Sequence, residues 1–194
     1  MLLVDGGSSD DTAARAQQLG AVVVTAPRGR GSQLRAGAAA ARTDWLLFLH
    51  ADTVLEMGWR DEVAVFMSGP GNDQRAAVFH FTLDDRAPDA RRLERWVEWR
   101  TRVLGLPYGD QGLLMHRSLY DQIGGYRAIP IMEDVDIIRR VGRRRTVLLT
   151  SRAVTSAERW RREGWLRRSA RNLFCLTLYF LGVPPQSIAR VYGR

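Results

Sequence analysis

Strand-like and helix-like stretches alternate through the first fifty residues of the chain. Short apolar runs at residues 2–4, 21–25 and 45–49 predict strands, and the segments between them predict helices over about residues 8–19 and 33–41. A helix that links two successive strands favours a parallel, right-handed crossover over an antiparallel α+β arrangement. The pattern therefore predicts an α/β fold with a Rossmann-like, mostly parallel sheet flanked by helices.

The run at residues 45–53, Trp-Leu-Leu-Phe-Leu-His-Ala-Asp-Thr, stops abruptly at His50 and reaches an acid at Asp52. Its apolar part suits a buried strand and is too short for a typical helix. Ligands of open α/β sheets collect outside the carboxyl ends of the strands, so these side chains can serve a cation and, through it, a phosphate. The alternative is that Asp52 begins a turn and caps the next helix. The spacing slightly favours a binding site.

Composition restricts the classes of function without selecting one. The chain has 194 residues, a net charge of +8 and 29 basic residues, all of them arginine. A complete absence of lysine is more typical of codon bias than of selection for a ligand, and no nucleic-acid-binding module is recognisable. The single cysteine, Cys175, cannot form an internal disulfide, and no secretory signal is recognisable, so we expect a cytoplasmic protein. The longest apolar run, residues 173–182, is too short to span a bilayer.

Acidic residues recur where ligands of such folds are bound. Asp5 and Asp52 follow predicted strands of one sheet, so we expect both at its carboxyl edge, and Glu133 and Asp134 open a later helix. Acids at a helix start also offset the helix dipole, so each alone is as consistent with a structural role. Their combination with glycine-rich turns and a loop that contains Arg30 favours a crevice for an anion or a nucleotide.

An ordered set of motifs resembles the family 2 glycosyltransferases of the GT-A fold. The motifs are Val-Asp-Gly-Gly-Ser-Ser-Asp-Asp-Thr (4–12), Gly-Arg-Gly-Ser-Gln-Leu-Arg-Ala-Gly-Ala (29–38), Leu-Phe-Leu-His-Ala-Asp-Thr (47–53), Tyr-Gly-Asp-Gln-Gly (108–112), Gly-Gly-Tyr (124–126), Pro-Ile-Met-Glu-Asp-Val-Asp (130–136) and Ser-Ala-Glu-Arg-Trp (156–160). The set covers nearly the whole chain, and its order is more specific than any one motif. It most resembles a small bacterial subgroup associated with radical-SAM and selenocysteine-containing domains, some members of which are linked to arsenosugar synthesis.

The resemblance implies transfer of a sugar from a nucleotide-diphosphate sugar to an unidentified acceptor hydroxyl, with Mn²⁺ or Mg²⁺ as cofactor. It implies a metal ligand at Asp52 and a general base at Asp134, beside Glu133. The positions that it assigns to nucleotide-sugar binding are Asp5, Gly6, Arg30, His50, Ala51, Asp52, Asp110, Gln111, Arg159 and Trp160. A single base opposite the leaving group implies direct displacement with inversion. Neither a nucleic-acid partner nor a particular oligomeric state is implied.

The chain departs from the family pattern at its N-terminus and at three positions. The usual first strand, with a Pro-x-x-Asn-Glu type segment, is missing. Arg35 stands where asparagine is usual, and Ser156 replaces the glutamine of the Arg-Trp motif. His50 replaces the first aspartate of Asp-x-Asp, as is common in the subgroup. Without the first strand, the strand that contains Val4 should become an edge or leave a gap in the sheet. We expect that a misplaced start codon accounts for the omission. The alternative is a truncated, non-catalytic module that binds a nucleotide sugar or a partner. A nucleotidyltransferase is disfavoured because the glycine-rich N-terminal loop of such enzymes is absent.

We expect one domain over residues 1–194. It divides into a nucleotide-binding half at residues 1–67, an acceptor and catalytic half at residues 76–150, and a C-terminal helical segment at residues 151–194. Basic residues 159–171 followed by apolar residues 173–181 can form an amphipathic helix in peripheral contact with the inner face of a membrane. The sequence favours ordinary packing of this helix against the domain, which predicts no binding to anionic vesicles.

Overall fold

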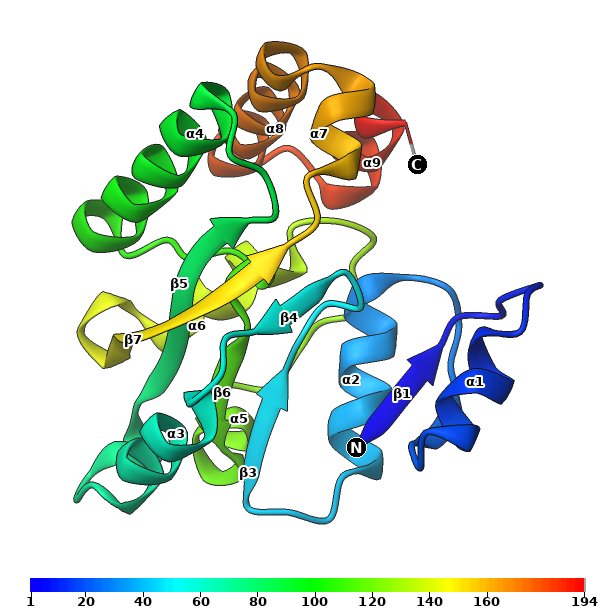
Figure 1. The fold of residues 1–194 in the computed structure, drawn as a ribbon, viewed down its shortest axis with the longest axis vertical. Coiled ribbons are helices and arrows are strands. Elements are labelled where there is room, and N and C mark those ends of the chain that lie inside the picture. Colours follow the sequence, from blue (N-terminus) through cyan, green and yellow to red (C-terminus); the bar gives the residue numbers. More distant parts are fainter. Residues whose placement is uncertain (194) are drawn as a thin grey trace.

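The larger of two sheets forms the centre of the molecule in the computed structural model, which describes residues 1–193 (Figure 1). Its strands, in spatial order, are β3 (Trp45–Phe48), β6 (Leu113–His116), β5 (Ala76–Leu83), β7 (Thr146–Thr155) and β4 (Thr53–Leu55). Only β5 and β7 pair in parallel, and the other three pairings are antiparallel. The predicted α/β architecture is present, but this sheet is mixed, because strand direction depends on distant pairing partners that local periodicity does not define.

A separate, smaller sheet carries the N-terminal residues. It consists of β1 (Leu2–Asp5) and β2 (Val22–Thr25), which are parallel and joined by the crossover helix α1 (Thr12–Gln18). Within residues 1–193, β1 pairs only with β2 and β3 pairs only with β6, so each has one open edge. The expected gap in the sheet is therefore present.

Helix α2 (Arg30–Ala40) lies against both sheets. Its Gln33 side chain donates a 2.9 Å hydrogen bond to the carbonyl oxygen of Val4 in β1. A Cβ atom at Gly37 would lie 2.9 Å from a methyl group of Val4, so the absence of a side chain permits this close packing. Ala38 of the same helix is buried with Leu46 of β3 in the main core.

Helices cover both faces of the larger sheet. Alongside α2, one face is packed by α5 (Arg117–Gln122) and α6 (Glu133–Val141), through buried residues that include Leu119, Tyr120, Ile137, Ile138 and Val141. The other face is packed by α3 (Trp59–Ser68), through Val63 and Phe66 against Phe79, Leu114 and Ala153. The sheet therefore has a buried layer on each side, which holds its strand ends in fixed positions.

Two local irregularities lie near the end of the larger sheet, in the segment at residues 53–68 and in β7. The segment first forms β4, which pairs with the end of β7, and the helix begins only at Trp59. Strand β7 also contains a bulge, because Val78 pairs with Leu148 whereas His80 pairs with Arg152. The bulge shifts the register of the second half of β7 and so determines where the chain leaves the sheet.

Four helices lie beyond the end of the sheet, at the top of Figure 1. They are α4 (Pro88–Trp99), which continues as a π-helical turn at Arg100–Leu104, then α7 (Glu158–Glu163), α8 (Trp165–Phe180) and α9 (Pro185–Tyr192). Short 3₁₀ turns occur at Asn72–Gln74, Gly109–Gln111 and Arg143–Arg145. Among residues 1–193, no helix combines the length and the apolar character that crossing a membrane requires.

Candidate functional site

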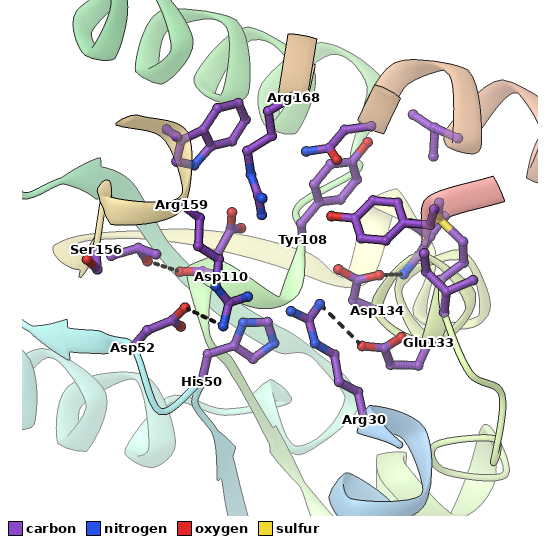
Figure 2. A pocket seen from close by; sticks show the side chains of 18 residues that line it. Arg30, His50, Asp52, Tyr108, Asp110, Glu133, Asp134, Ser156, Arg159 and Arg168 are labelled. Carbon is purple, nitrogen blue, oxygen red and sulfur yellow. Dashed lines mark hydrogen bonds and ion pairs between the residues drawn. The ribbon is translucent and has the colours of Figure 1, made fainter. Parts of the chain in front are cut away.

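A cleft opens where the ends of the larger sheet meet the four distal helices (Figure 2). It is lined by side chains from the β3–β4 turn, the starts of α2 and α6, the turn before β6, the β7–α7 connection, α7, α8 and α9. They are Arg30, His50, Asp52, Tyr108, Asp110, Ile131, Met132, Glu133, Asp134, Val135, Thr155, Ser156, Arg159, Trp160, Arg168, Asn172, Leu176 and Tyr192. Segments far apart in the sequence thus contribute charged, aromatic and apolar groups to one cleft.

His50 and Asp52 lie in the turn that follows β3. The backbone of this turn is fixed by hydrogen bonds from Thr53 N–H to the carbonyl of His50 at 3.2 Å and from Ser156 N–H to the carbonyl of Asp52 at 3.0 Å. The Asp52 carboxylate is about one-third exposed and lies 3.8 Å from a guanidinium nitrogen of Arg159. The β7–α7 connection therefore holds the backbone of Asp52, and the first turn of α7 places a cation beside its side chain.

His50 is mostly buried between acidic and basic side chains. Burial lowers the pKa of its imidazole, and the nearby charge of Arg30 lowers it further, against the opposing effects of Asp134 and Asp52. A neutral imidazole keeps one ring nitrogen free to accept a hydrogen bond or bind a metal. A Cβ atom at Gly109 would lie 2.6 Å from Nε2 of His50, so a larger residue there would displace the imidazole.

Glu133 and Asp134 open α6 on the opposite side of His50 from Asp52 (Figure 2). The residue before them, Met132, has a φ of 65°, a left-handed conformation that is uncommon outside glycine and costs free energy. The Asp134 carboxylate accepts hydrogen bonds from Gly109 N–H at 3.0 Å and from Val135 N–H at 2.8 Å. Glu133 is buried, with Arg30 3.9 Å away. Of the two acids, Asp134 is the more accessible to the cleft.

Asp110 presents a partly buried carboxylate to the cleft. Burial, against the opposing charge of Arg100, raises its pKa to about 6. One of its oxygens, Oδ1, is buried and has no hydrogen-bond partner within the part of the chain that the structure describes. Arg100 is itself buried, and its guanidinium lies 3.2 Å from the ring centre of Tyr108. A buried arginine therefore packs against the ring of Tyr108, at the start of the turn that carries Asp110.

The distal wall of the cleft comes from α7, α8 and α9. Trp160 stacks on Trp165 with 5.8 Å between ring centres, and the Arg168 guanidinium lies 5.0 Å from the Trp160 ring. Asn172 follows one helical turn after Arg168, and its buried Oδ1 has no hydrogen-bond partner among the described residues. Sequence reasoning missed Tyr108, Arg168, Asn172 and Tyr192 as lining residues. Polar residues one turn apart on an otherwise apolar helix were the available signal.

The structure gathers most, but not all, of the residues that the sequence predicted. Those that line the cleft are Arg30, His50, Asp52, Asp110, Glu133, Asp134, Arg159 and Trp160. Asp5, Gly6, Ala51 and Gln111 are not among its lining residues. The expectation that Asp5 and Asp52 follow strands of the same sheet is wrong, because β1 and β3 belong to separate sheets.

Two of these four residues have clear structural roles. The Asp5 carboxylate accepts hydrogen bonds from Gly7 N–H, Ser8 N–H and the Ser8 hydroxyl, which lower its pKa. Gln111 is buried: its amide donates to the carbonyl of Phe79 and its oxygen accepts from the hydroxyl of Thr101. Gln111 therefore fixes the turn that carries Asp110, and its side chain faces the core.

Metal binding at this cleft would require ligands from outside the protein. Within residues 1–193, no three histidine, cysteine or acidic side chains gather as a metal site. Asp52, with the neutral imidazole of His50 two residues before it, provides the chemistry of a partial site for a hard cation. Such a cation takes its other oxygen ligands from water or from phosphate, so the donor set suits a metal that arrives with an anionic ligand.

Comparison with known proteins finds one protein family whose sequence model matches the chain. A sequence model described as "Glycosyl transferase family 2" matches residues 1–130. No curated protein matches the chain at a significant level. The matched segment contains the cleft residues from Arg30 to Asp110, whereas α6, α7, α8 and α9 lie after it.

Solved structures share the fold at low sequence identity. A crystal structure of GalNAc-T7 with UDP, GalNAc and Mn²⁺ aligns with a TM-score of 0.56 and 14% identity, over 80% of this chain and 37% of that chain. Glucosyl-3-phosphoglycerate synthase of Mycobacterium tuberculosis, with Mn²⁺ and UDP-glucose, aligns with a TM-score of 0.52 and 19% identity, over 80% and 57%. A mycobacterial protein aligns with a TM-score of 0.52 and 23% identity, over 80% and 54%. The expected GT-A fold is confirmed, and the chain spans less than two thirds of each of these structures.

Proposed function

The chain belongs to the family 2 glycosyltransferases, and we propose that it moves a sugar from a nucleotide-diphosphate sugar to an acceptor hydroxyl with inversion at the anomeric carbon. The observation that carries the proposal is the placement of Asp52 and Asp134 on opposite sides of one cleft, with His50 between them (Figure 2). The order of the sequence motifs also supports membership of the subgroup associated with radical-SAM and selenocysteine-containing domains.

Asp52 and His50 form the end of the cleft that we assign to the diphosphate. A divalent cation, Mn²⁺ or Mg²⁺, would be held by Asp52 with His50 beside it, and when bound it would neutralise charge on the leaving diphosphate. Arg159 and Arg30 reach the same end of the cleft, where guanidinium groups can bind phosphate oxygens. This assignment agrees with the Mn²⁺ and UDP-sugar present in structures that share the fold.

Asp134 is the carboxylate that we assign as general base. A base must be ionised and must reach the acceptor hydroxyl, and the two backbone N–H groups that bond to Asp134 fix its orientation in the cleft. Glu133 is buried near Arg30, which suits a role in positioning that arginine. The Oδ1 of Asp110 is buried, so this carboxylate reaches an acceptor hydroxyl less readily than Asp134, despite its raised pKa. One base and direct attack by the hydroxyl give inversion.

The distal wall is the side that we assign to the acceptor. Tyr108 and Tyr192 provide flat faces that can pack on a sugar ring, and Leu176 adds apolar surface. The buried Oδ1 of Asn172 offers a hydrogen-bond acceptor to a ligand hydroxyl. These features suit a hydroxyl-rich acceptor with an apolar face.

A donor assay tests the proposal without knowledge of the acceptor. Purified protein is incubated with Mn²⁺ and a panel of nucleotide sugars, and ¹H NMR records slow donor hydrolysis and the anomer first released. We expect Asp52→Ala to weaken the binding of UDP with Mn²⁺ by at least about tenfold, whereas Asp134→Asn should bind the donor but lose about 10²-fold or more in hydrolysis. Asp121→Asn is the control, because Asp121 is exposed on α5, outside the cleft. First release of the anomer that retains the donor configuration would rule out inversion.

A second candidate is a non-catalytic module that binds a nucleotide sugar. Strand β1 has an open edge, and Asp5 and Gly6 lie outside the cleft lining. The site therefore lacks the nucleotide contacts that the sequence led us to expect from these two residues. Tight binding of UDP with Mn²⁺ in calorimetry, without hydrolysis of any donor or transfer to any acceptor, would favour this candidate.

A further inference from the structure

Helix α8 has two faces with different surroundings. Its inner face contributes Arg168, Asn172 and Leu176 to the cleft. Its outer face carries large apolar side chains that recur at helical spacing and continue just past the helix end. Their exposed fractions are 86% at Leu166, 54% at Leu173, 54% at Phe174, 47% at Phe180 and 75% at Leu181. No packing partner within residues 1–193 buries this outer face, so the ordinary packing that the sequence favoured accounts for only one side of the helix.

The helices around the outer face carry a net positive charge. Helix α8 contains three arginines and no acidic residue. Over residues 158–193, which cover α7, α8 and α9, there are seven arginines and two glutamates. One of these glutamates, Glu163, already accepts a 2.9 Å hydrogen bond from Arg168 and is also paired with Arg171. The apolar face therefore lies in a strongly basic region.

From this combination we propose that the outer face of α8 docks on an anionic membrane surface. A helix with an apolar stripe and a basic flank inserts the stripe at the boundary between headgroups and acyl chains, while its arginines attract anionic headgroups. Long apolar side chains exposed in one row lose contact with water in this position.

A second copy of the same helix is a poorer occupant. Side chains at positions 166, 170, 173, 177 and 180 follow the spacing of a coiled-coil seam. Because α8 has no acidic residue and Glu163 pairs with only two of its three arginines, two copies would bring together surfaces of the same net charge. An anionic lipid surface provides the missing charge complement.

Docking by this face has a geometric consequence for the cleft. The residues of α8 that line the cleft lie on the opposite side of the same helix from the docking face. A helix with its side chains is about 10 Å across, so the cleft would lie roughly one helix diameter from the lipid surface. The proposed docking does not depend on sugar transfer, and the two can be tested separately.

Vesicle sedimentation tests the proposal. The whole chain is mixed with vesicles of phosphatidylcholine alone, or of phosphatidylcholine with about one quarter phosphatidylglycerol, at low and high salt. We expect binding to the anionic vesicles that weakens with salt, and little binding to the neutral ones. The double variant Leu173→Ser, Phe174→Ser should bind anionic vesicles at least about tenfold more weakly. Because both side chains are exposed, the fold should persist, and circular dichroism checks this.

A matched variant removes apolar surface elsewhere. Leu19→Ser with Val65→Ser changes two side chains that are 81% and 72% exposed, one just after α1 and one on α3, and should bind vesicles as the parent chain does. Failure of the parent chain to bind anionic vesicles, or equal weakening in the two double variants, would overturn the proposal. A dimer in sedimentation velocity that only Leu173→Ser, Phe174→Ser dissociates would also overturn it, because a second copy would then cover the face.

Discussion

Glu62 should be a major anchor of the structure despite its distance from the cleft. It lies in the first turn of α3, and its carboxylate reaches the bulge of β7. There it accepts hydrogen bonds from Thr150 N–H at 2.6 Å, the Thr150 hydroxyl at 2.7 Å and Ser151 N–H at 2.8 Å. The bulge interrupts the ladder with β5 at these residues, so Glu62 supplies acceptors that the neighbouring strand does not.

The pKa of Glu62 sets the size of the expected effect. Burial alone would raise it, but the hydrogen bonds from Ser151 and Thr150 outweigh burial and lower the pKa from 4.5 to about 2. At about 1.4 kcal/mol per pH unit, the difference between these two values corresponds to at most about 3 kcal/mol of stability. Because the side chain is partly exposed, solvent screening reduces this, and we expect Glu62→Gln to lower the free energy of unfolding by about 1–2 kcal/mol at neutral pH.

Urea denaturation at a series of pH values measures this contribution. The folded-state pKa lies below the unfolded value, so the stabilisation is complete above about pH 4.5 and is lost as the pH falls toward about 2. The difference between the parent chain and Glu62→Gln should therefore be constant from about pH 6 to 8 and shrink below about pH 4.5. Asp61→Asn is the control, because Asp61 is an exposed acid in the same helical turn and experiences a similar helix dipole. The reasoning fails if the two variants are equally stable at neutral pH, or if the difference does not shrink in acid.

Three further variants probe the cleft and its supports by thermal or urea denaturation. Burial raises the pKa of Asp110 from 3.8 to about 6, so its ionisation costs stability as the pH rises from about 4 to above 6. Asp110→Asn should therefore stabilise the protein by about 1–3 kcal/mol near pH 8 but not near pH 4, measured with a chelator present. Gly31→Ala should destabilise by about 1–3 kcal/mol, since its Cβ would lie 2.2 Å from the carbonyl oxygen of Arg127; an unchanged midpoint would show that the loop yields freely. Arg117→Met should cost about 1–3 kcal/mol, since Arg117 donates to three carbonyl oxygens at and after the end of α2, including Ala41 at 2.7 Å; a loss near zero would mean that water replaces these bonds.

Local patterns predicted the elements better than their pairing. The strands near residues 2–4, 21–25 and 45–49 were found because apolar and β-branched residues cluster there. The strand at Thr53–Leu55 was missed because its three residues have no stability outside their pairing with β7. Strand direction was misjudged for the same reason: a strand has one local pattern in either orientation, and its partner lies far away in sequence.

The site was predictable where chemistry coincides with a strand end. Asp52 and Asp134 could be found because acids directly follow a strand or open a helix. Gln111 was assigned to the ligand because a polar residue in a turn has the same sequence signature whether it faces a cleft or, as here, the core. Arg168 and Asn172 were missed because α8 reaches the cleft only through its packing on α6 and α9, which no local pattern encodes.

The ion pairs of the cleft differ from those that hold the fold together. Arg30 and Arg159 lie 3.9 Å and 3.8 Å from their acidic neighbours, Glu133 and Asp52, which is beyond hydrogen-bond distance. The structural pair of Arg91 with Glu94 is closed at 2.6 Å. A loosely paired guanidinium keeps its donors available, and the nearby carboxylate limits the cost of holding it in the cleft. Arginines held in this way can turn to phosphate oxygens without breaking a strong bond, which is the behaviour that binding and release of a diphosphate require.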